Sequence, residues 1–73
     1  MPLTTTGTAA NVRAELARQG DSPSVLCSLL GLSYSAVSRR VRGETPFRDS
    51  ELVVIAKHLG VPIAVLFGEA RAS

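Results

Sequence analysis

Hydroxyl and guanidinium groups recur at helical spacing between residues 34 and 42. On a helix that starts after Ser33, four of these side chains share one face, because a turn takes about 3.6 residues: Ser35, Ser38, Arg39 and Arg42. Val37 and Val41 fall on the opposite face. Hydroxyls and guanidiniums reach phosphates and the acceptor edge of guanine. The spacing predicts a helix that packs on the protein by one face and enters a DNA major groove by the other.

The positive charge of the chain is concentrated near this helix. The net charge is only +2, but four of the eight Lys and Arg residues lie between positions 39 and 48: Arg39, Arg40, Arg42 and Arg48. Glu44 is the only acid among them. The plain alternative is a solvated charged face, and the coincidence with the polar helix face favours nucleic-acid binding.

Apolar spacing and turn residues predict the elements that position this helix. The predicted helices cover residues 8–19, 22–31, 34–42 and 48–59, and a short fifth helix opens at Val61-Pro62. Ser22 and Ser33 are expected to cap helix starts, and Gly31, Gly43 and Gly60 to end helices. We therefore predict an all-α fold, a compact bundle of five short helices with a helix-turn-helix. Residues 1–7 are expected to form a flexible arm, 8–68 the domain and 69–73 a frayed tail.

The connection between the second and third predicted helices has the pattern of a helix-turn-helix. Cys27 is small where two backbones approach, and Gly31 supplies a left-handed residue that reverses the chain. Val37 points back between the two helices. In a helix-turn-helix, the second helix enters the major groove.

These segments resemble the Cro/cI-type (XRE-like, lambda-repressor-like) helix-turn-helix regulators of phages and bacteria. The resemblance runs from position 11 to about 68, through NVRAELARQG, SPSVLCSLLGLS, AVSRRVRGETPF and ELVVIAKHLGVPIAVLF. It implies a five-helix DNA-binding domain that acts as a homodimer on a palindromic operator. The expected activity is that of a Cro-like repressor that blocks a promoter by occupying its operator.

The resemblance also implies where DNA contacts fall. The base-reading positions carried over are Tyr34, Ser35 and Arg39, with Ser38 beside them. The phosphate-contacting positions carried over are Ser22, Ser24, Arg42, Gly43 and Thr45. Arg40 and Arg48 of the basic cluster are expected to contact phosphates as well. Pro23 stands where many members have a bracing Gln, so Ser22 or Ser24 would replace that contact. Tyr34 also fits a partly buried ring at the helix start.

Enzymes and metal proteins are poorly supported by the composition. One His and one Cys give no catalytic or metal-ligand constellation. His58 fits a helix C-terminus, and Cys27 fits the core. We expect no cofactor and no small-molecule ligand. The longest apolar runs are too short to span a bilayer and no leader pattern is present, so we expect a cytoplasmic protein without membrane contact.

The C-terminal part carries more apolar side chains than one core stripe needs. Ordinary packing is one interpretation. The other is a dimer contact near the fifth helix, formed by Val61, Ile63, Leu66 and Phe67, that would set two recognition helices about 34 Å apart. Two further functions remain open. An antitoxin or excision regulator would use the same DNA-binding fold, whereas a helical protein-interaction module would use the Arg cluster only for solubility.

Overall fold

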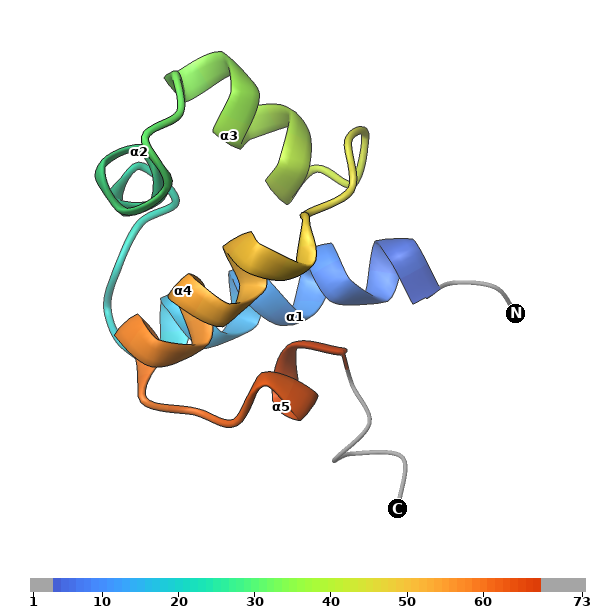
Figure 1. Cartoon of the computed structure of the whole chain (residues 1–73), viewed down its shortest axis with the longest axis vertical. Helices are drawn as coiled ribbons and strands as arrows, with labels where there is room; N and C mark the ends of the chain where they lie inside the picture. The colour runs from blue at the N-terminus through green and yellow to red at the C-terminus, as the bar shows by residue number, and fades with distance from the viewer. Residues whose placement is uncertain (1–3, 68–73) are drawn as a thin grey trace.

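The computed structural model describes residues 4–67, and the predicted all-helical fold is confirmed there, with no strand. The described part contains five helices: α1 Thr4–Arg18, α2 Val25–Leu30, α3 Tyr34–Val41, α4 Asp49–Leu59 and α5 Ile63–Phe67. Helices α2 and α3 lie on one side of α1 and α4, and α5 covers the opposite side (Figure 1). None of the helices within residues 4–67 is long and apolar enough to cross a membrane.

Helix α1 begins at Thr4, where the sequence predicts a flexible arm through Gly7. Its buried positions Ala9, Val12 and Leu16 have the predicted spacing and are at most 2% exposed. Once packed turns have formed a helix, each further turn costs little, because helix growth is much easier than nucleation. The weak helix formers at the start of α1 therefore continue the helix. Residues 1–3 of the predicted arm and residues 69–73 of the predicted tail lie outside the described residues.

Helix α2 also differs from its prediction, because it begins at Val25 and Ser22 does not cap it. The first backbone N–H groups bond to carbonyls three residues earlier, as from Val25 to Ser22 at 3.1 Å. This tight turn is the usual alternative to a side-chain cap at a helix end. The Ser22 hydroxyl instead contacts the Ser24 hydroxyl at 2.8 Å.

Three other predicted helix ends, at Ser33, Gly31 and Gly60, are confirmed, whereas α3 ends at Val41 with Arg42, not Gly43, as its C-cap. The Ala36 N–H donates to the Ser33 hydroxyl at 3.2 Å, so Ser33 caps α3. Gly31 and Gly60 follow α2 and α4 with φ of +65° and +70°, the left-handed conformation that glycine adopts without steric cost.

The core lies between α1, α4 and α5 and extends under α2 and α3. Its members are apolar residues at most 7% exposed: Val12, Leu16, Leu26, Val37, Val41, Leu52, Ile55, Ala56, Leu59 and Leu66. Leu66 is 0% exposed. Its placement corrects the predicted dimer surface, because a side chain in the core cannot contact a second chain.

Side chains from α1 and from the residue after it donate hydrogen bonds to carbonyls at the C-terminal ends of neighbouring helices. The last carbonyls of a helix have no partner within that helix. The Asn11 side-chain amide donates to the Leu66 carbonyl of α5 at 3.1 Å, and the Gln19 amide donates to the Leu59 carbonyl of α4 at 3.0 Å. Two shorter helices are therefore held near their C-terminal ends, one by a side chain of α1 and the other by the residue that directly follows α1.

The adjacent residues Leu66 and Phe67 provide a test of this core. We expect Leu66→Ala to lower the free energy of unfolding by about 2–5 kcal/mol, because it leaves a cavity. Phe67→Ala should cost less, since Phe67 is 39% exposed. Urea unfolding followed by circular dichroism measures both, and equal losses would contradict the placement of Leu66.

Candidate nucleic-acid interface

The α2–α3 connection has the geometry expected of a helix-turn-helix. Gly31 reverses the chain, and its N–H and that of Leu32 bond to the Cys27 carbonyl. Val37 is 0% exposed. One face of α3 therefore packs against the protein, and the opposite face is exposed to solvent.

The polar side chains that are predicted to share one face of α3 lie side by side on its solvent-exposed face. They line one shallow hollow: Tyr34, Ser35, Ser38, Arg39 and Arg42. We call this set the α3 polar face. Tyr34 is 65% exposed, which does not fit its alternative interpretation as a partly buried cap. The α3 polar face has the hydroxyl, phenol and guanidinium groups that contact bases and phosphates.

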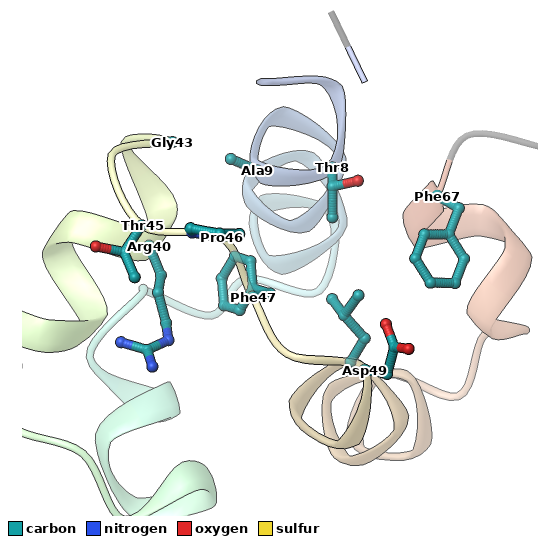
Figure 2. Close-up of a pocket in the computed structure, with 10 residues that line it drawn as sticks. Thr8, Ala9, Arg40, Gly43, Thr45, Pro46, Phe47, Asp49 and Phe67 are labelled. Carbon is teal, nitrogen blue, oxygen red and sulfur yellow. The ribbon is translucent and has the colours of Figure 1, made fainter. Parts of the chain in front are cut away.

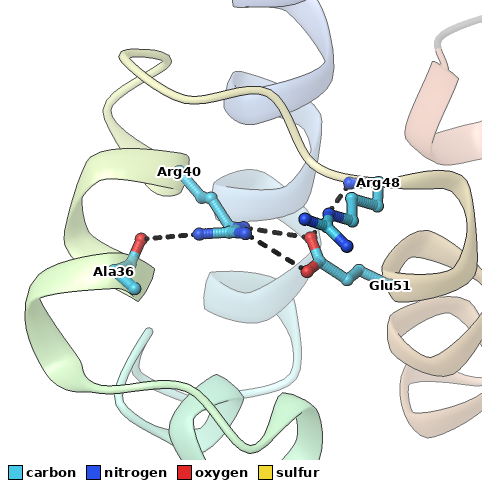
Figure 3. A network of polar contacts seen from close by, with 4 residues as sticks. All are labelled: Ala36, Arg40, Arg48 and Glu51. Atoms are coloured by element: carbon cyan, nitrogen blue, oxygen red, sulfur yellow. Dashed lines mark hydrogen bonds and ion pairs between the residues drawn. The ribbon is translucent and has the colours of Figure 1, made fainter.

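Arg40 is turned away from the α3 polar face. Its Nε donates to Glu51 Oε1 at 3.0 Å and its Nη2 to Glu51 Oε2 at 3.3 Å, as Figure 3 shows. The two side chains are only 11% and 13% exposed. The sequence predicts that Arg40 contacts a phosphate, whereas the structure uses its guanidinium in a two-point ion pair inside the protein.

Glu51 holds the start of α4 as well as α3. Its Oε1 also accepts the backbone N–H of Arg48 at 2.9 Å (Figure 3). An acidic residue in the first turn of a helix satisfies a free N–H and complements the helix dipole. Nothing in the sequence signals the ion pair between Glu51 and Arg40, which are 11 positions apart.

A second contact fixes the C-terminal end of α3. Arg13 Nη1 on α1 donates to the carbonyl of Val41, the last residue of α3. A cation is favourable there, because the carbonyl end of a helix carries partial negative charge. With the Arg40–Glu51 pair, this contact attaches α3 to both α1 and α4.

Arg42 belongs to the α3 polar face but has partners within the chain. Its guanidinium bonds to both carboxylate oxygens of Glu44, at 2.9 and 3.3 Å, and to the Ser38 hydroxyl at 2.6 Å. Chiefly through the hydrogen bond, Arg42 holds the pKa of Glu44 below its ordinary value. Glu44 is thus charged at neutral pH, and the pair is lost only on acidification through that pKa. The sequence shows Glu44 as an isolated acid, without its partner.

The remaining predicted phosphate contacts are placed differently. Ser22 and Ser24 are exposed before α2, and Arg48 is exposed before α4. Gly43 and Thr45 are half-buried, and their backbone N–H groups donate to carbonyls of α3. Both line a hollow of about 250 Å³, separate from the α3 polar face, between the α3–α4 loop (residues 42–48), α1, α4 and Phe67 (Figure 2).

Asp21 and His58 pair with each other. The His58 Nε2 lies 3.1 Å from Asp21 Oδ2, which connects α4 to the segment before α2. No group of three potential metal ligands is found among the described residues. Cys27 is a half-buried free thiol packed against the core.

We predict that the Arg40–Glu51 pair contributes strongly to stability. Glu51→Gln keeps an acceptor for the Arg48 N–H but removes the charge opposite Arg40. The expected loss is about 1–3 kcal/mol of unfolding free energy, because a nearly buried guanidinium is left without a counter-charge. Thermal unfolding gives the loss. Asp49→Asn is the control, since it removes an exposed carboxylate from the same helix turn; a similar loss in both variants would refute the assigned role of the pair.

Comparison with known proteins gives one informative match. No curated protein and no solved structure shows significant similarity to the chain. The model of the BetR domain matches residues 5–73. This is a small helical domain associated with helix-turn-helix DNA-binding regulators. With nearly its whole length matched, the chain belongs to the BetR domain family.

Proposed function

We propose that this protein is a sequence-specific double-stranded DNA-binding transcriptional regulator that places α3 in the major groove of its operator. The observation that carries the proposal is the α3 polar face, an exposed set of hydrogen-bonding side chains on a helix whose other face is buried. The BetR family supports a DNA-binding regulatory role.

Arg39 is the residue best suited to read a base. Its side chain is exposed, and within residues 4–67 no hydrogen bond or ion pair is found at its guanidinium, which interacts with the Glu44 carboxylate only through charge. Arg40 and Arg42 are both bound to carboxylates. An unengaged guanidinium can donate two parallel hydrogen bonds to O6 and N7 of guanine. We assign Tyr34, Ser35 and Ser38 to neighbouring bases or phosphates.

In its finer form, the proposal is a Cro-like repressor that acts in a bacterial cytoplasm, as the sequence resemblance implies. Repression would follow from occupying an operator that overlaps a promoter. A palindromic operator requires two copies of the domain. Candidate dimer contacts are Val61, Ile63 and Phe67, of which Phe67 is exposed and the other two are half-buried.

The direct test is selection of bound duplexes from a random DNA pool. The enriched duplex is then titrated against a scrambled duplex at two salt concentrations. We expect an enriched palindrome bound at least about a thousand-fold more tightly than the scrambled duplex. Weak binding without an enriched sequence would contradict the proposal and favour the protein-interaction module.

The dimer is tested by sedimentation of the protein with and without the enriched duplex. We expect two protein chains on each palindromic duplex. Phe67→Glu should weaken the second binding event, because it places a charge in an apolar contact. A single chain on the duplex at every protein concentration would contradict the dimer while leaving DNA binding intact.

Arg39→Ala tests base reading. We expect it to lose about 1–3 kcal/mol of discrimination against a changed base pair, with a much smaller loss on scrambled DNA. Titration of the variant with the enriched, the base-changed and the scrambled duplex gives the affinity ratios that measure this discrimination. Arg18→Ala is the control, because Arg18 is an exposed arginine on α1, outside the α3 polar face. A loss by Arg39→Ala that is equal on both duplexes would show that Arg39 contacts only phosphates.

A further inference from the structure

Arg42 already makes, within the free protein, the kind of contact that arginine makes to phosphate. Its Nε and Nη2 point in parallel at the two carboxylate oxygens of Glu44, and its Nη1 donates to the Ser38 hydroxyl. Two parallel N–H···O bonds to paired oxygens are the common geometry for both carboxylate and phosphate. The partner of Arg42 is therefore a close chemical substitute for a DNA phosphate oxygen pair.

The backbone determines where the Glu44 carboxylate lies. The Glu44 N–H donates to the Arg39 carbonyl at 2.9 Å, and the Thr45 N–H donates to the same carbonyl at 3.2 Å. Just before them, Gly43 has a φ of +83°, a conformation that favours glycine. This turn folds the α3–α4 loop back over the end of α3 and brings Glu44 next to the α3 polar face.

Both members of the pair are accessible to DNA. The side chains of Arg42 and Glu44 are 55% and 53% exposed. A contact in solvent is weak and exchanges readily, because water and salt compete with it. It is thus unlike the Arg40–Glu51 pair, which is nearly buried and has a structural role.

We propose that Glu44 occupies, in the free protein, the place on Arg42 that a backbone phosphate takes in the DNA complex, so that Glu44 sets the affinity for DNA. This inference rests on the proposed function and adds to it one residue, Glu44, that opposes DNA binding. The contact of Arg42 with DNA becomes an exchange of one anion for another. After the exchange, the Glu44 carboxylate is still charged and still lies near the phosphates, so it keeps one salt cation close to it. This cation offsets the one that is released from the contacted phosphate.

The salt dependence of binding measures this exchange. A phosphate neutralised by a free arginine steepens the plot of log K against log salt by about 0.9. In the wild type, we expect the Arg42 contact to contribute little to this slope. Glu44→Gln removes the competing charge. It should raise the affinity for the enriched duplex about two- to five-fold at low salt and steepen the slope by about 0.9.

A double-variant cycle separates the pair from general repulsion. In an Arg42→Gln background, Glu44→Gln should change the affinity and the slope much less, because only the weaker interaction of Glu44 with Arg39 is then lost. Asp49→Asn removes an exposed carboxylate on α4, outside the α3 polar face, and should leave both quantities unchanged. The melting temperature of Glu44→Gln should stay close to that of the wild type, because both side chains are exposed.

Three results would overturn the inference: an unchanged slope in Glu44→Gln, the same gain in the Arg42→Gln background, or the same gain in Asp49→Asn. Its failure is distinct from that of the proposed function. If the wild type enriches a sequence but the cycle shows no coupling, only the role of Glu44 is wrong. If the wild type enriches no sequence, DNA recognition itself is wrong.

Discussion

The Arg40–Glu51 pair is the interaction on which the candidate interface depends. Helix α3 has eight residues, and isolated helices of this length are marginal in water. Its position must therefore come from contacts with the rest of the protein. Burial of Val37 and Val41 stabilises the contact, but apolar contacts are non-directional and do not fix how α3 is oriented. The two-point ion pair does, because it fixes α3 relative to the first turn of α4. Together with the Arg13 contact to the Val41 carbonyl, that attachment sets the direction in which the α3 polar face points.

The order and the ends of most helices could be predicted from local sequence. Ser33, Gly31 and Gly60 act through the backbone within a few residues of themselves, so their effect is visible without a fold. The starts of α1 and α2 could not be predicted as well. At α1, packing of later turns extends the helix through Thr and Gly, and at α2 a tight turn replaces the expected Ser22 cap.

The α3 polar face could also be predicted, because residue spacing fixes which side chains share a helix face. The partners of the arginines could not. Arg40 and Glu51 are 11 positions apart and lie on different helices, and a long side chain at the border of a face can turn either way. The same limit explains Leu66, whose apolar character fits both a core and an interface. Three neighbouring arginines thus have three different environments that their common residue type does not reveal.

Helix α1 has a consequence for how the domain loses its structure. Asn11 and Arg13 of α1, and Gln19 directly after it, each supply a hydrogen bond to the carbonyl end of a different helix: α5, α3 and α4. Release of α1 would leave three helix ends without these hydrogen bonds at once. We therefore expect α3, α4 and α5 to open together rather than one at a time. Amide protons in α3, α4 and α5 would then exchange with solvent through one shared opening event. The surface proposed to meet DNA would share the cooperativity of the whole domain.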